Sequence, residues 1–161
     1  MEVILFTIGY TRDVIDLILP IQQEEFNIPV DLSMQPDLKD IPAIYQKGKG
    51  NFWLAIENNS LVGTIGLIDI GKNEGALKKM FVHPDYRGSK YGTGQLLLQT
   101  LLKWSENKQI QVIYLGTRKE FVAAQKFYEK NNFKETSRSS LPDNFPVMET
   151  DNKFYSYSSI K

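Results

Sequence analysis

The chain contains no cysteine and only one histidine, His83. The absence of cysteine excludes disulfide bonds, cysteine nucleophiles and cysteine-based zinc sites. With one histidine, zinc sites of the Cys/His type and serine–histidine triads of the usual kind are disfavoured as well. We interpret His83 as a surface residue and expect no metal site.

The chain also lacks an excess of charge of either sign and a long hydrophobic run. Its 19 basic and 19 acidic residues are mixed along the sequence and give a formal net charge of zero. We therefore expect no nucleic-acid partner and no membrane partner. The longest apolar runs, 3–7 and 61–70, are too short for a membrane span, and no signal core follows the N-terminus. A soluble cytoplasmic protein is expected, and monomer or homodimer stays open.

A chain of 161 residues can bury a substantial core, and we expect a single domain over 1–161. The hydrophobic period separates strands from helices. The expected strands are 3–7, 52–57, 61–70, 76–82, 112–115, 133–136 and 154–157. The expected helices are 11–25, bent at Pro20, 38–47, 92–107 and 121–131. This order indicates an α+β domain.

A loop rich in glycine and basic residues follows Val82 and leads into the helix expected at 92–107. The first N–H groups of a helix have no intrahelical partner, so such a loop suits phosphate. It is not a Walker loop, because Tyr91 follows Lys90 and no G-x-x-x-x-G-K-[ST] occurs. It is not a dinucleotide fingerprint, because Leu97 stands at the third glycine. An ordinary strand-to-helix turn is the other alternative.

The loop resembles the pyrophosphate loop of the GNAT superfamily of N-acetyltransferases, Arg/Gln-x-x-Gly-x-Gly/Ala after Val-x-Pro-x-Tyr-Arg-Gly. Arg87 and Gly92 occupy the two ends of that pattern, and Lys90 departs from it at the first glycine. Residues 124–133 resemble the family's Ala-x-x-Phe-Tyr-Glu-Lys-x-Gly-Phe, with Asn132 in place of the glycine. Phe121 replaces an asparagine that many members carry, which removes a polar contact to the pantetheine arm. Two motifs in this order favour the resemblance over an ordinary turn.

The resemblance implies a GNAT fold, a mixed and mostly antiparallel sheet flanked by helices on both faces. It also implies transfer of an acetyl group from acetyl-CoA to a primary amine by direct attack. The substitutions at Lys90 and Phe121, and the lack of a clear base, leave an alternative open. In that alternative the same fold binds acyl-CoA as a sensor or interaction module without turnover.

The resemblance also implies which residues contact acetyl-CoA. A bulge in the strand before the loop lets the main chain pair with the pantetheine arm, and an N–H there stabilises the oxyanion. The cofactor-binding residues implied in this way are Met80, Phe81, Val82, Arg87, Gly88, Ser89, Lys90, Tyr91, Gly92, Thr93 and Gly94. Tyr128 occupies the position of the family's general acid, and an ordinary tyrosine is protonated at neutral pH. The alternative interpretation is that Tyr128 is a core residue of an amphipathic helix.

The general base is left open by the sequence. Glu74 begins the strand that leads to the loop, from which the family often draws a base, but a solvated turn carboxylate is the competing interpretation. Asp69, Glu149 and Asp151 are further candidates, and ordered water can replace a dedicated base. The acceptor is expected to be a cationic amine bound beside the long segment 137–153 and the connection after the first helix. The residues expected there are Glu25, Phe26, Phe145, Glu149 and Asp151.

Overall fold

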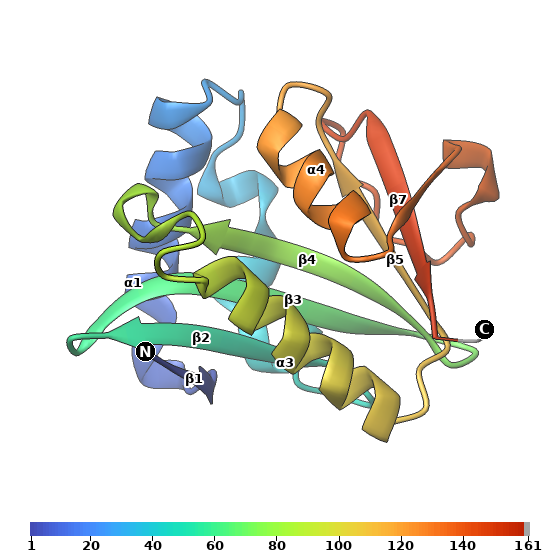
Figure 1. Ribbon diagram of the computed structural model, residues 1–161, viewed down its shortest axis with the longest axis horizontal. Coiled ribbons are helices and arrows are strands. Elements are labelled where there is room, and N and C mark those ends of the chain that lie inside the picture. The colour runs from blue at the N-terminus through green and yellow to red at the C-terminus, as the bar shows by residue number, and fades with distance from the viewer. Residues whose placement is uncertain (160–161) are drawn as a thin grey trace.

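The computed structural model describes residues 1–159, in which one mixed sheet has the strand order β1-β2-β3-β4-β5-β7-β6 (Figure 1). Neighbouring strands are antiparallel except β4 and β5, which are parallel. The strands are β1 (Glu2–Leu5), β2 (Asn51–Glu57), β3 (Ser60–Gly71), β4 (Glu74–Val82), β5 (Val112–Thr117), β6 (Lys134–Thr136) and β7 (Lys153–Ser158). The α+β architecture expected from the sequence is confirmed.

Helices cover both faces of the sheet, as expected (Figure 1). Successive side chains of a strand point to opposite faces: Phe52 and Leu54 of β2 pack in the cluster that contains Val14 and Ile18, whereas Trp53 packs with the other helices. Each fully buried aliphatic side chain stabilises the fold by about 1.5–3 kcal/mol. The face that holds Phe52 and Leu54 carries α1 (Thr11–Pro20) and α2 (Ile41–Ile44). The face that holds Trp53 carries α3 (Thr93–Asn107) and α4 (Val122–Lys130).

Two expected helices differ from the structure. The helix expected at 11–25 ends as α1 at Pro20 and continues as a π-helical turn, Ile21–Glu25, in which the Phe26 amide donates to the Ile21 carbonyl at 3.1 Å. Pro20 has no N–H for the regular ladder. The helix expected at 38–47 is a short 3-10 turn, Pro36–Lys39, followed by α2. Asp40 separates them with an extended φ of −146°. The ends of the other elements shift by one or two residues.

β4 bulges within its pairing with β3, which continues beyond the bulge to Val82. Ile65 of β3 lies opposite two residues of β4, Lys79 and Met80. Lys79 has a φ of +54°, and its carbonyl accepts a hydrogen bond from the Thr64 hydroxyl at 2.7 Å. A bulge interrupts the ladder and re-aims the residues beside it. The bulge that the resemblance implied at 80–82 therefore begins one residue earlier, at Lys79.

Candidate active site

A cavity of about 550 Å³ lies where β4 and β5 diverge. The two strands pair only along 74–76 and 112–114. Beyond that point 77–82 and 115–117 separate and line the cavity, together with residues of α4 and the segment after α1. Ligands commonly bind at the carboxyl ends of parallel strands. Met80, Phe81 and Val82, expected to contact a cofactor, all line this slot.

Two glycines shape the loop between β4 and α3. Gly88 has a φ of +95° and Gly92, the residue before α3, has a φ of +63°; both angles lie in the left-handed region that favours glycine. A Cβ added at either residue would meet no heavy atom within 4 Å. Both glycines therefore combine a demanding backbone conformation with open space beside them, as close approach of a ligand to the main chain requires.

The start of α3 offers backbone donors. The first intrahelical bond runs from the Leu96 amide to the Gly92 carbonyl at 2.9 Å, so the amides of Thr93, Gly94 and Gln95 precede the ladder. The Thr93 hydroxyl is buried and donates to the Tyr86 carbonyl at 2.9 Å, which anchors the loop. These amides and the helix dipole form a terminus suited to an anion.

The side chains of the loop have different positions. Arg87, Gly88 and Gly94 line the cavity, whereas residues 89–93 lie outside its lining. The Tyr91 ring contacts the Tyr86 ring, with a centroid separation of 5.0 Å, and Lys90 Nζ lies 5.3 Å from the Tyr91 ring centre. The side chains of Lys90 and Tyr91 thus cover the loop itself.

Arg87 is held by an ion pair with Glu25. Its Nη1 lies 2.5 Å from Glu25 Oε2 and its Nη2 lies 2.8 Å from Oε1. Arg87 Nε donates to the Val82 carbonyl at 2.9 Å. The hydrogen bond from Arg87 lowers the pKa of the Glu25 carboxyl. Glu25, expected in the acceptor site, therefore lies at the loop between β4 and α3 and not in the cavity lining.

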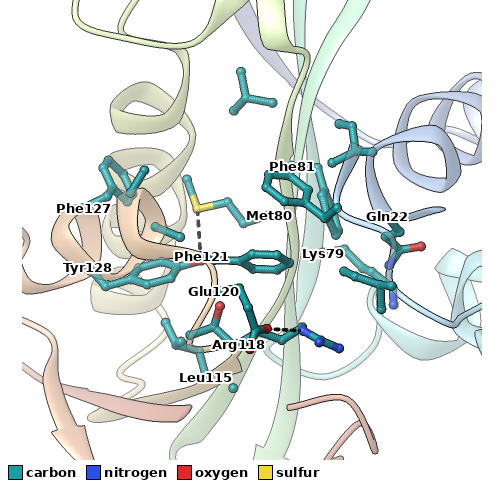
Figure 2. Close-up of a pocket in the computed structure, with 18 of the residues that line it drawn as sticks. Gln22, Lys79, Met80, Phe81, Leu115, Arg118, Glu120, Phe121, Phe127 and Tyr128 are labelled. Atoms are coloured by element: carbon teal, nitrogen blue, oxygen red, sulfur yellow. Dashed lines mark hydrogen bonds and ion pairs between the residues drawn. The ribbon is translucent and has the colours of Figure 1, made fainter. Parts of the chain in front are cut away.

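An aromatic contact joins the segment after α1 to the start of α4. The Phe26 and Phe121 rings have a centroid separation of 4.6 Å, and both residues line the cavity. Figure 2 shows Phe121 projecting into the middle of the cavity. The position at which the resemblance predicts asparagine thus has an apolar contact in this chain.

Tyr128 of α4 belongs to both the core and the cavity. The residue is 7% exposed, and its ring packs against Phe133 and Tyr155. Its hydroxyl points across the cavity toward Met80, 3.8 Å from the thioether sulfur (Figure 2). Burial raises the pKa of the Tyr128 phenol well above its ordinary value. The phenol is therefore protonated at neutral pH, and its hydroxyl lies at the cavity.

The sequence matches the model of the Acetyltransferase (GNAT) family over residues 15–133. The chain belongs to this family. A GNAT-family acetyltransferase from Staphylococcus aureus Mu50 has 43% sequence identity and a TM-score of 0.94, with 98% of each chain covered. An acetyltransferase from Streptococcus agalactiae has 29% identity and a TM-score of 0.92, with 98% of this chain and 97% of the other covered.

More distant relatives extend these comparisons. N-acetylaspartate synthetase from Danio rerio is 29% identical over 118 residues, which are 70% of this GNAT chain and 41% of the relative. The chain thus spans about two fifths of that protein's length. A GNAT family acetyltransferase from Elizabethkingia anophelis with acetyl-CoA bound shares the fold, at 20% identity and a TM-score of 0.66 over 98% of this chain and 97% of the other.

A buried cation that the sequence analysis did not single out also lines the cavity of this GNAT protein. Lys79 Nζ donates to Gln35 Oε1 at 2.7 Å and lies 3.6 Å from Asp37 Oδ2. Gln35 exchanges hydrogen bonds with Gln22 at 2.9 Å, and Gln22 lines the cavity too. Burial lowers the pKa of the Lys79 ammonium, and the nearby charge of Asp37 opposes this decrease. The sequence signal that could have indicated a buried lysine is the pair of adjacent lysines, Lys78 and Lys79, in a mostly apolar strand.

Besides Glu25, three further residues expected in the site lie elsewhere. The Glu74 carboxylate accepts a hydrogen bond from the Tyr114 hydroxyl at 3.2 Å, at the paired end of β4 and away from the cavity. Phe145 is buried in a separate cluster with Ile70. Glu149 is exposed, whereas its neighbours Met148 and Thr150 line the cavity. By contrast, Phe26 and Asp151 of the expected acceptor set do line it.

The described part of the chain, residues 1–159, lacks both a membrane-spanning helix and a cluster of metal ligands. None of its helices has the length and apolar character that a membrane span requires. Its His, Asp and Glu side chains form no group of three or more that could hold a metal ion.

Proposed function

We propose that this GNAT protein transfers an acetyl group from acetyl-CoA to a primary amine by direct attack. The observation that carries the proposal is the course of one cavity, from Arg87 and Gly88 at the phosphate loop, along the β4–β5 slot, to Tyr128. A helix terminus for anions at one end and a narrow slot at the other match the pyrophosphate and pantetheine of coenzyme A. Bound acetyl-CoA would supply the thioester carbonyl and the thiolate leaving group.

The chain's own groups have distinct roles in this proposal. The amides of Thr93, Gly94 and Gln95 bind the pyrophosphate, and the bulged main chain of β4 pairs with the pantetheine arm. An N–H of residues 80–82 stabilises the oxyanion that forms at the thioester carbonyl. Tyr128 gives its proton to the departing sulfur. The fold neighbour with acetyl-CoA bound supports this choice of donor.

The acceptor is proposed to be a primary amine that carries positive charge when it enters. Asp151 is the member of the expected acidic set that lines the cavity, and Phe26 provides an apolar surface. We therefore place the positive charge of the acceptor at Asp151, although Lys78 and Lys79 line the same cavity. Because one relative is an N-acetylaspartate synthetase, amino acids belong among the candidate acceptors.

The test measures binding and turnover separately. Acetyl-CoA at 100 times its Kd should stabilise the fold by about 2.7 kcal/mol, which raises Tm by roughly 5–10 °C in a domain of this size. Release of free CoA is then followed with amino acids, spermidine and short peptides as acceptors. An unchanged Tm contradicts the choice of donor. If acetyl-CoA binds but no amine causes release of CoA, the result would favour the non-catalytic acyl-CoA module. Phe121 in place of asparagine is the residue that points to this alternative.

A further inference from the structure

The carboxylates that could serve as the general base differ in their surroundings. Asp69 accepts hydrogen bonds from main-chain amides outside the cavity, and Glu74 is paired with a tyrosine hydroxyl. Glu120 lines the cavity but is paired with Arg118 at 2.7 Å. Asp151 also lines the cavity, and it forms no ion pair within residues 1–159. Its Oδ2 accepts a hydrogen bond from the Met148 amide at 3.4 Å. Asp151 is thus a cavity carboxylate that has no ion-pair partner in the described residues.

β5 makes room for this carboxylate. A Cβ added at Gly116 would lie 2.5 Å from Asp151 Oδ2, so the carboxylate rests where any other side chain would begin. The turn that carries Asp151 is fixed on both sides. The Asp151 amide donates to the Met148 carbonyl at 3.0 Å, and the Asn152 amide donates to the Thr117 carbonyl at 2.9 Å. The position of the carboxylate is therefore set by main-chain contacts.

Charged and titratable groups from three elements face Asp151. Lys78 and Lys79 come from β4, Arg118 follows β5, and Tyr128 comes from α4. Burial raises the pKa of the Asp151 carboxyl, and the three cations and the hydrogen bond from the Met148 amide oppose that rise. The charge of Asp151 in turn contributes to the raised pKa of Tyr128. A proton acceptor and a proton donor thus share one cavity.

On the basis of the acetyl transfer proposed above, we propose that Asp151 is the general base that accepts a proton from the acceptor ammonium. A base must reach the amine at the point where the thioester lies. Asp151 lines the same cavity as Tyr128 and is near enough for its charge to act on the Tyr128 phenol. The site therefore selects primary amines that arrive protonated.

The proton balance is complete. The acceptor ammonium gives one proton to the Asp151 carboxylate, and the neutral nitrogen forms the N–C bond at the thioester carbonyl. As the C–S bond breaks, Tyr128 protonates the sulfur, and a proton from the attacking nitrogen restores the phenol. Ammonium and thioester thus yield amide, thiol and one proton, which Asp151 releases to solvent.

Asp151→Asn tests this assignment with the most active amine among amino acids, spermidine and short peptides. We expect kcat/KM at pH 7 to fall about 10²- to 10⁴-fold, with an unchanged acetyl-CoA Kd. The loss should shrink as pH rises, because more of the amine is then already neutral. Tm should stay the same or increase, since asparagine removes a buried charge that has no ion-pair partner.

Two further variants separate position from charge. Gly116→Ala keeps the Asp151 carboxylate but displaces it, and it should reproduce the loss of kcat/KM. Asp143→Asn removes an exposed carboxylate from the same segment and should leave kcat/KM unchanged. Wild-type activity in Asp151→Asn or Gly116→Ala, or an equal loss at every pH, would overturn the assignment. A wild type that binds acetyl-CoA but acetylates no amine would instead overturn the proposed function.

Discussion

Tyr128 belongs to the aromatic core and to the cavity wall: its ring packs in the core, and its hydroxyl lies at the cavity. The ring packs against Phe133 and Tyr155, so packing persists if only the oxygen is removed. The hydroxyl contacts the Met80 sulfur at 3.8 Å, a weak acceptor. Little folding energy therefore depends on the oxygen, which is consistent with a role in proton transfer.

Tyr128→Phe should lower kcat about 10²- to 10⁴-fold while the acetyl-CoA Kd stays nearly constant, because only the proton donor is lost. Steady-state kinetics and a binding titration measure the two effects. Tyr155→Phe is the matched control, since its hydroxyl donates to Glu129 Oε2 at 2.7 Å and Tyr155 does not line the cavity. An unchanged kcat in Tyr128→Phe would assign this residue to the core alone.

Arg87 is already engaged before any anion arrives, because Glu25 occupies both nitrogens of its fork. We therefore expect Glu25→Gln to tighten acetyl-CoA binding about two- to fivefold, the range of a partly exposed ion pair. The Glu25 carboxylate competes with the phosphate for Arg87 and also repels the phosphate. The gain in affinity should therefore decrease at high salt, which screens both interactions. Calorimetric titration at two salt concentrations measures this difference.

Glu24→Gln is the control for Glu25→Gln, because it removes the neighbouring exposed charge. Weaker acetyl-CoA binding in Glu25→Gln would mean that Glu25 positions Arg87 for the phosphate and does not compete with it. The pKa of Glu25 is lowered by Arg87, so the ion pair is present above the ordinary pKa of a glutamate and is lost as pH falls through the lowered value.

Among the elements, the connection from β4 to α3 forms the proposed anion site. Gly92 has a φ of +63°, and the space beside its Cα is open. We expect Gly92→Leu to weaken acetyl-CoA binding at least about tenfold, because the side chain enters that space and the left-handed backbone costs about 1–2 kcal/mol. Gly92→Ala has the same backbone cost with little bulk, so comparing the two Kd values separates strain from obstruction. Wild-type affinity in Gly92→Leu would remove this loop from the cofactor site.

Elements with a clear hydrophobic period were predictable, and those shaped by distant contacts were not. The strands 51–57 and 60–71 and the long helix 93–107 lie within one residue of their expected ends. The π-helical turn Ile21–Glu25 has no signal of its own in the sequence, although its last residue pairs with Arg87 far along the chain. Likewise, the bulge at Lys79 depends on the register of β3 against β4.

At the scale of the whole molecule, the cavity exists because β4 and β5 are parallel neighbours that pair along only three residues each. Their divergence lets the segment after α1, the start of α4 and the turn that carries Asp151 approach the same slot. These segments are far apart in the sequence. No local pattern could therefore predict which of the acidic residues in 137–153 would line the cavity.

The sequence by itself determined the family, the order of elements and the glycine loop, because each depends on residues that are close together in the chain. The φ values of Gly88 and Gly92 are an example, since they follow from local steric requirements. Only the tertiary structure decided that Glu25 pairs with Arg87, that Glu74, Phe145 and Glu149 lie outside the cavity, and that Asp151 rests over Gly116. These contacts arise when distant segments pack together, and the spacing of residues within one segment carries no information about them.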